Sequence, residues 1–115
     1  MSDIANLTQL LLQFREERNW KQFHNPKDVA LSLTLEAAEL LELMQWKSGD
    51  ELAAHLEKNK EAVSDELADI LAWVLVFASD QNIDMVAAMK SKIAKNAAKY
   101  PIDKSRNVAK KYTEL

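Results

Sequence analysis

Apolar side chains recur every three or four residues along most of this chain, which is the spacing of one face of an α-helix. The first series predicts a helix that begins at Ser2 or Asp3, since either residue can cap it, and that continues to about Trp20. The apolar positions of this helix are Ile4, Leu7, Leu11 and Phe14. The charged residues Arg15, Glu16, Glu17 and Arg18 are assigned to its other side.

The second helix is predicted from the residues at its two ends. Asn25 can cap a helix, and Pro26 suits the first helical position because an N–H there would be left unpaired in any case. The helix is expected to run to about Lys47. It should stop at Gly49, since the only glycine of the chain can adopt the left-handed conformation that terminates helices.

The later part of the chain is predicted to form a short helix joined to a long one, followed by a last helix. Asp50 can cap the short helix, residues 51–58, and apolar periodicity continues as far as Gln81. Asp84 can cap the last helix, which should end at Pro101 because proline cannot continue a helix.

The composition also favours an all-α protein. With one Gly, two Pro and many helix-forming residues among 115, the chain has few turn formers, and its length corresponds to a single domain. We expect an all-α domain over residues 1–101 and a polar C-terminal tail over 102–115, docked or flexible. The chain has no cysteine, so disulfide and thiolate chemistry are excluded.

Charge and hydropathy restrict the partners. The net charge is −3 and no basic stripe is visible, which argues against binding to nucleic acid. Neither a signal-peptide pattern at the start nor a run of 18 apolar residues is found, so a cytoplasmic protein without a membrane partner is expected.

One stretch, residues 70–78, is apolar on every side of its predicted helix. A helix of this kind is normally central in a bundle. We therefore predict that a second subunit covers it and that the four-helix-bundle-like fold assembles as a homodimer or homotetramer.

The candidate chemistry lies in two pairs of acidic residues, Glu36 with Glu39 and Glu66 with Asp69. Residues three apart project from the same side of a helix, so each helix aims two carboxylates in one direction, beside its apolar stripe. Four converging carboxylates would repel one another unless a cation joined them. Oxygen ligands without Cys or His favour Mg²⁺, with Mn²⁺ as a substitute. Glu39 is our candidate for orienting or deprotonating an attacking water.

The four acidic residues also allow two interpretations other than a Mg²⁺-dependent enzyme. In the first, the carboxylates form salt bridges at the rim of a helical-bundle interaction module that has no catalytic role. In the second, they belong to a di-iron bundle, but such sites use Glu-x-x-His pairs, and neither His24 nor His55 lies three residues after a Glu.

The chain also resembles a known family over nearly its whole length. The two acidic pairs, together with Glu17–His24, Gln45–Lys47, Asn96–Pro101 and Lys111–Leu115, are similar to the MazG-like all-α nucleoside triphosphate pyrophosphohydrolases, and most of all to their dCTP pyrophosphatase branch. The resemblance implies hydrolysis of a nucleoside triphosphate between its α and β phosphates, with dCTP or a modified dCTP favoured, as part of nucleotide-pool housecleaning. The metal ligands would be Glu36, Glu39, Glu66 and Asp69.

The resemblance also implies a set of substrate-binding residues. Trp20 to His24 match a segment that contacts base and sugar, and Trp46 matches an aromatic wall of the nucleoside pocket. Trp73 aligns with a position near the substrate that is Tyr in close relatives, and it could equally be an ordinary core residue. The complete set is Trp20, Lys21, Gln22, Phe23, His24, Trp46, Trp73, Lys92, Lys95, Asn96 and Tyr100.

Substrate choice stays open at this point. Leu11 stands where the animal enzymes have His, which implies a looser base preference here. Similar acidic helices occur in phosphoribosyl-ATP pyrophosphohydrolases, but the aromatic residues Trp20, Phe23 and Trp46 favour a nucleoside pocket.

Overall fold

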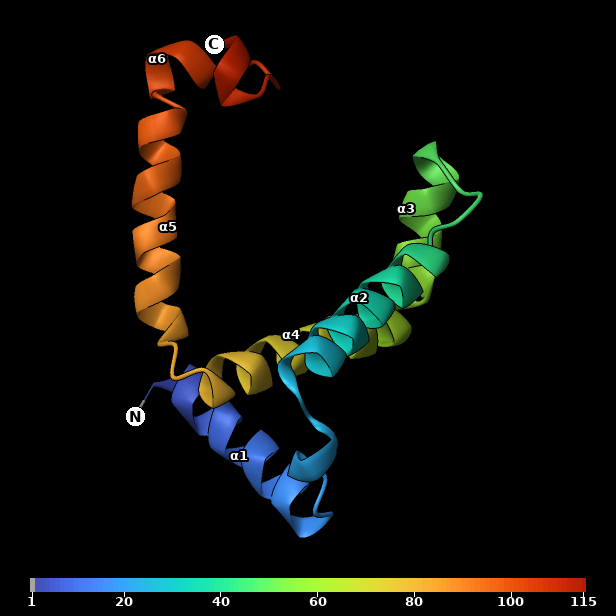
Figure 1. The fold of residues 1–115 in the computed structure, drawn as a ribbon. Coiled ribbons are helices and arrows are strands. Elements are labelled where there is room, and N and C mark those ends of the chain that lie inside the picture. Colours follow the sequence, from blue (N-terminus) through green and yellow to red (C-terminus); the bar gives the residue numbers. More distant parts are fainter. Residues whose placement is uncertain (1) are drawn as a thin grey trace. The chain divides into compact units, whose positions relative to one another are not determined.

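The computed structural model describes residues 2–115, and within them every regular element is a helix (Figure 1). The all-α fold predicted from the sequence is therefore confirmed. The chain forms two compact units, one that ends at Asn82 and one that comprises Ile83–Leu115. The first unit contains α1 (Asp3–Glu17), the 3₁₀ helix η1 (Lys21–Phe23), α2 (Pro26–Glu42), α3 (Gly49–Lys58) and α4 (Lys60–Asp80). The second contains α5 (Met85–Lys99), α6 (Ile102–Ser105) and the 3₁₀ helix η2 (Tyr112–Glu114).

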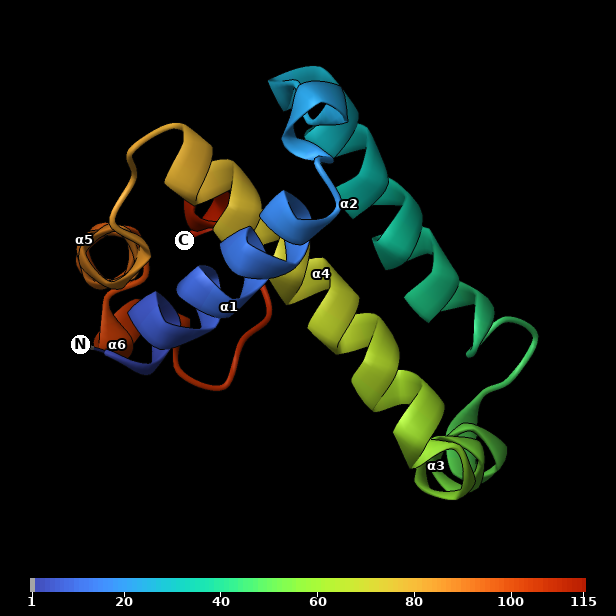
Figure 2. The ribbon, with the colours of Figure 1, turned by 90° about the horizontal axis from the view of Figure 1, so that it is seen from below.

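The first unit is built around α4, the longest helix. α2 lies beside α4 along much of its length, and α1 packs against the later part of α4 (Figures 1 and 2). The most buried apolar side chains are Val29 of α2 and Leu75, Val76 and Ala78 of α4. Because α2 and α4 share this core, residues on their facing sides are held close together.

The predicted caps are confirmed for three helices. The side chain of Ser2 accepts a hydrogen bond from the N–H of Ala5 at 3.1 Å, and Asn25 accepts one from Asp28 at 2.9 Å. Asp84 caps α5 in the same way, at 3.0 Å from the N–H of Ala87. Each bond pairs an N–H that the start of a helix leaves without a helical partner.

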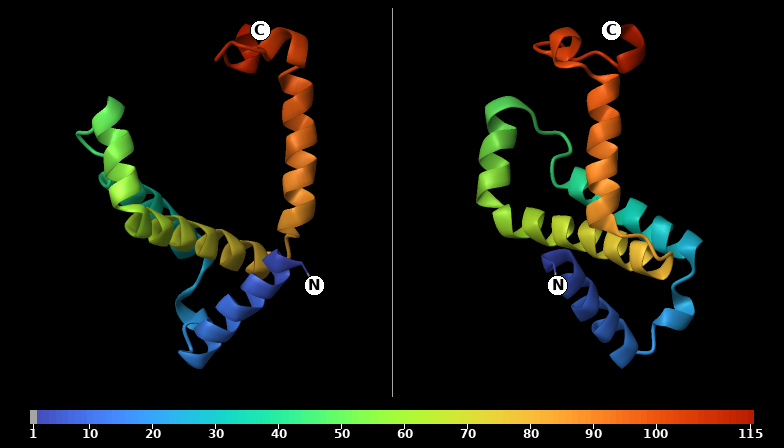
Figure 3. Two further views of the ribbon diagram at one scale, coloured as in Figure 1. Left: turned by 180° about the vertical axis from the view of Figure 1, so that it is seen from behind. Right: turned by 90° about the vertical axis from the view of Figure 1, so that its left-hand side faces the viewer.

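The predicted end of α2 is wrong. The helix stops at Glu42, well before Lys47, and the residue with a left-handed backbone in the following turn is Trp46, at φ 67°. Gly49 does have a positive φ, of 57°, but it begins α3, and Ser48 rather than Asp50 occupies the cap position. Periodicity could not find this stop, because the apolar spacing continues through the turn. α3 then turns away from the direction of α4 (Figure 3).

The second unit consists of α5 and the C-terminal residues that fold against its end. The ring of Tyr112 meets that of Tyr100 edge to face at 6.0 Å, and Nζ of Lys99 lies 4.8 Å from the centre of the Tyr112 ring. Tyr112 of the tail therefore contacts the end of α5, whereas the predicted domain with its boundary at residue 101 stays a prediction. None of the helices among residues 2–115 is long and apolar enough to cross a membrane.

Candidate metal centre and substrate site

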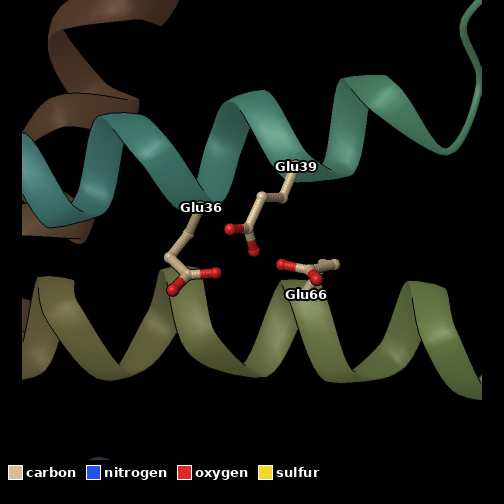
Figure 4. A group of neighbouring side chains, drawn as sticks. All are labelled: Glu36, Glu39 and Glu66. Carbon is tan, nitrogen blue, oxygen red and sulfur yellow. The ribbon is translucent and has the colours of Figure 1, made fainter.

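Three of the four predicted metal ligands meet between α2 and α4. Glu36 and Glu39 extend from α2 toward Glu66 of α4, as Figure 4 shows. One carboxylate oxygen from each residue lies within 4.8 Å of the other two. The close packing of the two helices therefore brings together residues that are 30 positions apart in the sequence.

The electrostatics of this group are unfavourable without a cation. Removal from water is the main cause that raises the pKa of Glu36 to about 7, and the neighbouring carboxylates of Glu66 and Glu39 add to the rise. Burial also raises the pKa of Glu66, and the charges of Glu39 and Asp69 act in the same direction. Crowded, partly dehydrated carboxylates favour the protonated form because charge repulsion is then relieved.

The donor set fits a hard divalent cation. Oε2 of Glu36 and Oε2 of Glu66 are buried, and neither has a hydrogen-bond partner within the described residues. Buried polar atoms in proteins are almost always paired, so these two oxygens fit a positively charged partner. Ligation by oxygen alone is the preference of Mg²⁺ and Mn²⁺.

Asp69 lies outside the group of three. It is exposed on α4, one turn after Glu66, and its charge still raises the pKa of both Glu36 and Glu66. The i, i+3 spacing keeps Asp69 on the same side of α4 as Glu66. Its role as a fourth ligand stays a prediction.

The predicted aromatic residues are found in two different places. His24 meets Trp73 edge to face, with ring centres 5.2 Å apart, so the segment after α1 reaches the acidic helix α4. Trp20 packs against Phe14 of α1 at 5.9 Å, and Phe23 is exposed. Trp46, by contrast, is 90% exposed in the turn between α2 and α3.

The other predicted substrate residues are less well defined. Lys21 and Gln22 are exposed in η1, and the amide of Gln22 donates to the carbonyl of Asn19 at 2.9 Å. Lys92, Lys95, Asn96 and Tyr100 belong to the second unit, where the first three are exposed. Their contact with substrate stays a prediction.

The sequence pattern missed a partly buried ion pair. Arg15, which was assigned to the charged side of α1, is 6% exposed, and its guanidinium donates to both carboxylate oxygens of Asp80 at 2.8 Å. The pair and His24 line a cavity of about 460 Å³ between α1 and the end of α4. Arg15 carried no sequence signal of this role, because its partner is 65 residues away.

Comparison with known proteins finds a matching family and similar chains. The model of the MazG-like family matches residues 31–115. dCTP pyrophosphatase 1 of Rattus norvegicus is 38% identical over 114 residues, which cover 97% of this chain and 67% of that protein. The Homo sapiens protein of the same name is 34% identical over the same shares.

A solved structure is similar as well. The crystal structure of a pyrophosphatase from Archaeoglobus fulgidus superimposes with a TM-score of 0.83 and 39% identity, covering 88% of this chain and 94% of that one. The chain belongs to the MazG-like family. The predicted class of enzyme, a nucleoside triphosphate pyrophosphohydrolase, is thereby confirmed.

Proposed function

We propose that this enzyme is Mg²⁺-dependent, prefers dCTP or a modified dCTP, and cleaves between the α and β phosphates to release the monophosphate and pyrophosphate. The observation that carries the proposal is the convergence of Glu36, Glu39 and Glu66 within 4.8 Å. A triphosphate is strongly anionic, so an acidic cluster is compatible with it only when cations lie between the two.

The acidic residues have two roles in this proposal, metal binding and activation of the attacking water. Glu36, Glu39 and Glu66, with Asp69 as a fourth ligand, would hold the metal, which when bound would neutralise phosphate charge and polarise the phosphorus. Glu39 is exposed, in contrast to the partly buried Glu36 and Glu66, and it orients or deprotonates the attacking water. Mn²⁺ is expected to replace Mg²⁺, since both take oxygen ligands.

The nucleoside is bound by aromatic residues. The rings of Trp20 and Trp46 offer flat faces for stacking, while His24 and Trp73 bring the segment after α1 close to the acidic helix. The names of the similar proteins favour dCTP. Lys92, Lys95, Asn96 and Tyr100 contact phosphate or sugar in this proposal.

Assembly into a homodimer or homotetramer completes the proposal. An apolar groove between α1 and α4 has a volume of about 420 Å³, and several of its side chains are exposed, including Leu10 at 63% and Phe14 at 48%. A second copy would remove this surface from water.

The proposed role of the enzyme is the removal of unwanted nucleotides from the cytoplasmic pool.

The test is a turnover panel with Mg²⁺. All common dNTPs, NTPs and 5-modified dCTPs are incubated with the enzyme, and pyrophosphate is scored against phosphate. We expect pyrophosphate from cytosine deoxynucleotides above all, and its loss in Glu36→Gln, Glu66→Gln and Asp69→Asn.

Matched controls are available on the same helices. Glu42→Gln and Asp65→Asn remove exposed carboxylates of α2 and α4 that lie outside the group of three, and both variants should retain turnover. Release of single phosphates alone would contradict the α–β cleavage. Full activity in all three site variants would contradict the metal assignment.

A further inference from the structure

Arg15 joins two parts of the first unit through two different groups. Its guanidinium binds Asp80, the last residue of α4, and its backbone carbonyl accepts a hydrogen bond from the N–H of Trp20 at 3.1 Å. The segment Trp20–His24 therefore leaves α1 from a residue that is itself fixed to α4.

The other end of this segment is fixed to the same helix. The His24 ring contacts Trp73, and Asn25 then caps α2, the helix that carries Glu36. Trp73 and Asp80 lie seven residues apart on α4, so they share one side of it. A helical wheel places both within about 60° of Glu66, and the segment thus lies along the acidic side of α4.

We propose that Arg15 and Asp80 are positioning residues for the substrate site. Their forked ion pair sets the orientation of the segment Trp20–His24 relative to Trp73, and so relative to the carboxylates of α4. The inference rests on the proposed function, because the segment is there assigned to the nucleoside.

The chemistry of the ion pair between Arg15 and Asp80 favours a role in orienting the segment Trp20–His24 over a role in stabilising the fold alone. A guanidinium that donates two parallel bonds to one carboxylate fixes both distance and angle, which a packed apolar pair does not. Buried ion pairs often add little stability over apolar residues of similar size, because dehydration offsets the attraction. Arg15, Asp80 and His24 also line one cavity, so the ion pair and His24 lie in the same part of the first unit.

The experiment separates these two roles with a double variant. Arg15→Met with Asp80→Leu replaces the pair by apolar side chains that keep the helices packed but lack the fork. We expect a melting temperature close to that of the wild type, displaced ¹H resonances of the His24 ring, and a KM for dCTP raised about tenfold with kcat changed less than about twofold.

Two further variants complete the design. Arg15→Lys keeps the charge without the fork and should show the same displacement and KM change to a smaller extent. Leu56→Ala, in α3, lowers stability at a site away from Arg15 and Asp80. It should leave the His24 resonances and the KM for dCTP unchanged. The chain has two histidines, and His55→Gln assigns their resonances.

The proposal that Arg15 and Asp80 position the segment Trp20–His24 can be rejected with more than one variant. His24 resonances and a KM like those of the wild type in the double variant would overturn the proposal, as would displaced resonances with an unchanged KM. If the double variant does not fold, Arg15→Lys is judged by the same criteria. A wild-type enzyme that hydrolyses no nucleoside triphosphate would overturn the proposed function, and this inference with it, whatever the His24 resonances show.

Discussion

Arg15 and Asp80 are joined by two hydrogen bonds of 2.8 Å across 65 residues of sequence, and this pair should make the protein sensitive to acid. The bonds from the Arg15 guanidinium hold the pKa of Asp80 below its ordinary value of 3.8. A lowered folded-state pKa contributes stability that is present above pH 3.8 and is lost as the pH falls through the folded value.

Asp80→Asn checks this. At pH 7 the variant should lose about 2–4 kcal/mol of unfolding free energy, because the buried guanidinium of Arg15 is left without its anion. Urea titrations at pH 7 and at pH 3 should show the difference between variant and wild type shrinking at the lower pH. A constant difference would contradict the assignment to Asp80 ionisation.

Neutralising one carboxylate of the acidic group should have opposite effects with and without metal. Glu36→Gln removes a dehydrated negative charge beside Glu66 and Glu39, so the melting temperature in EDTA should rise at pH 8. In the wild type, Mg²⁺ at about 100 times its Kd should add about 2.7 kcal/mol of stability, and the variant should lose most of this gain.

Thermal scans with and without Mg²⁺ measure both effects. Glu42→Gln is the matched control, since it removes an exposed carboxylate from the same helix, and its response to Mg²⁺ should equal that of the wild type. An undiminished Mg²⁺ response in Glu36→Gln would show that the cation binds elsewhere.

Trp46 combines a left-handed backbone with a side chain that is 90% exposed, which is unfavourable for a large aromatic residue and is typical of residues at functional sites. Trp46→Gly should therefore raise the unfolding free energy by about 0.5–1 kcal/mol, because glycine adopts positive φ without strain. The KM for dCTP should rise about tenfold, since stacking on a base contributes about 1–3 kcal/mol.

Steady-state kinetics test the expected rise in KM, and denaturant unfolding tests the expected rise in unfolding free energy. Trp46→Phe keeps an aromatic face and should preserve most of the affinity. A KM unchanged in Trp46→Gly would remove Trp46 from the nucleoside site.

The apolar groove between α1 and α4 predicts an interface between copies. Leu71 lines the groove and is 42% exposed, so Leu71→Glu should place a charge in the interface and shift the protein toward monomer. Sedimentation velocity measures the change. Gln9→Glu, on the exposed surface of α1, is the control and should leave the assembly intact. A wild-type monomer would contradict the predicted oligomer.

Local rules determined the helices and their starts. Ser2, Asn25 and Asp84 were identified as caps because capping depends on residues within one turn, and the sequence contains that information in full. The i, i+3 spacing of Glu36 with Glu39 was informative for the same reason. The end of α2 was missed because the apolar spacing continues through the turn after Glu42, where Trp46 adopts a positive φ that its residue type disfavours.

Only the tertiary structure decided which of these residues meet. The crossing of α2 and α4 brings Glu66 to Glu36 and Glu39 and leaves Asp69 exposed beside them, and helix periodicity carries no information about that packing. The burial of Arg15 is of the same kind, since its charge indicated solvent and its partner lies at the far end of α4. The sequence by itself therefore determined the helices and the kind of chemistry, whereas contacts between distant residues decided the geometry of the site.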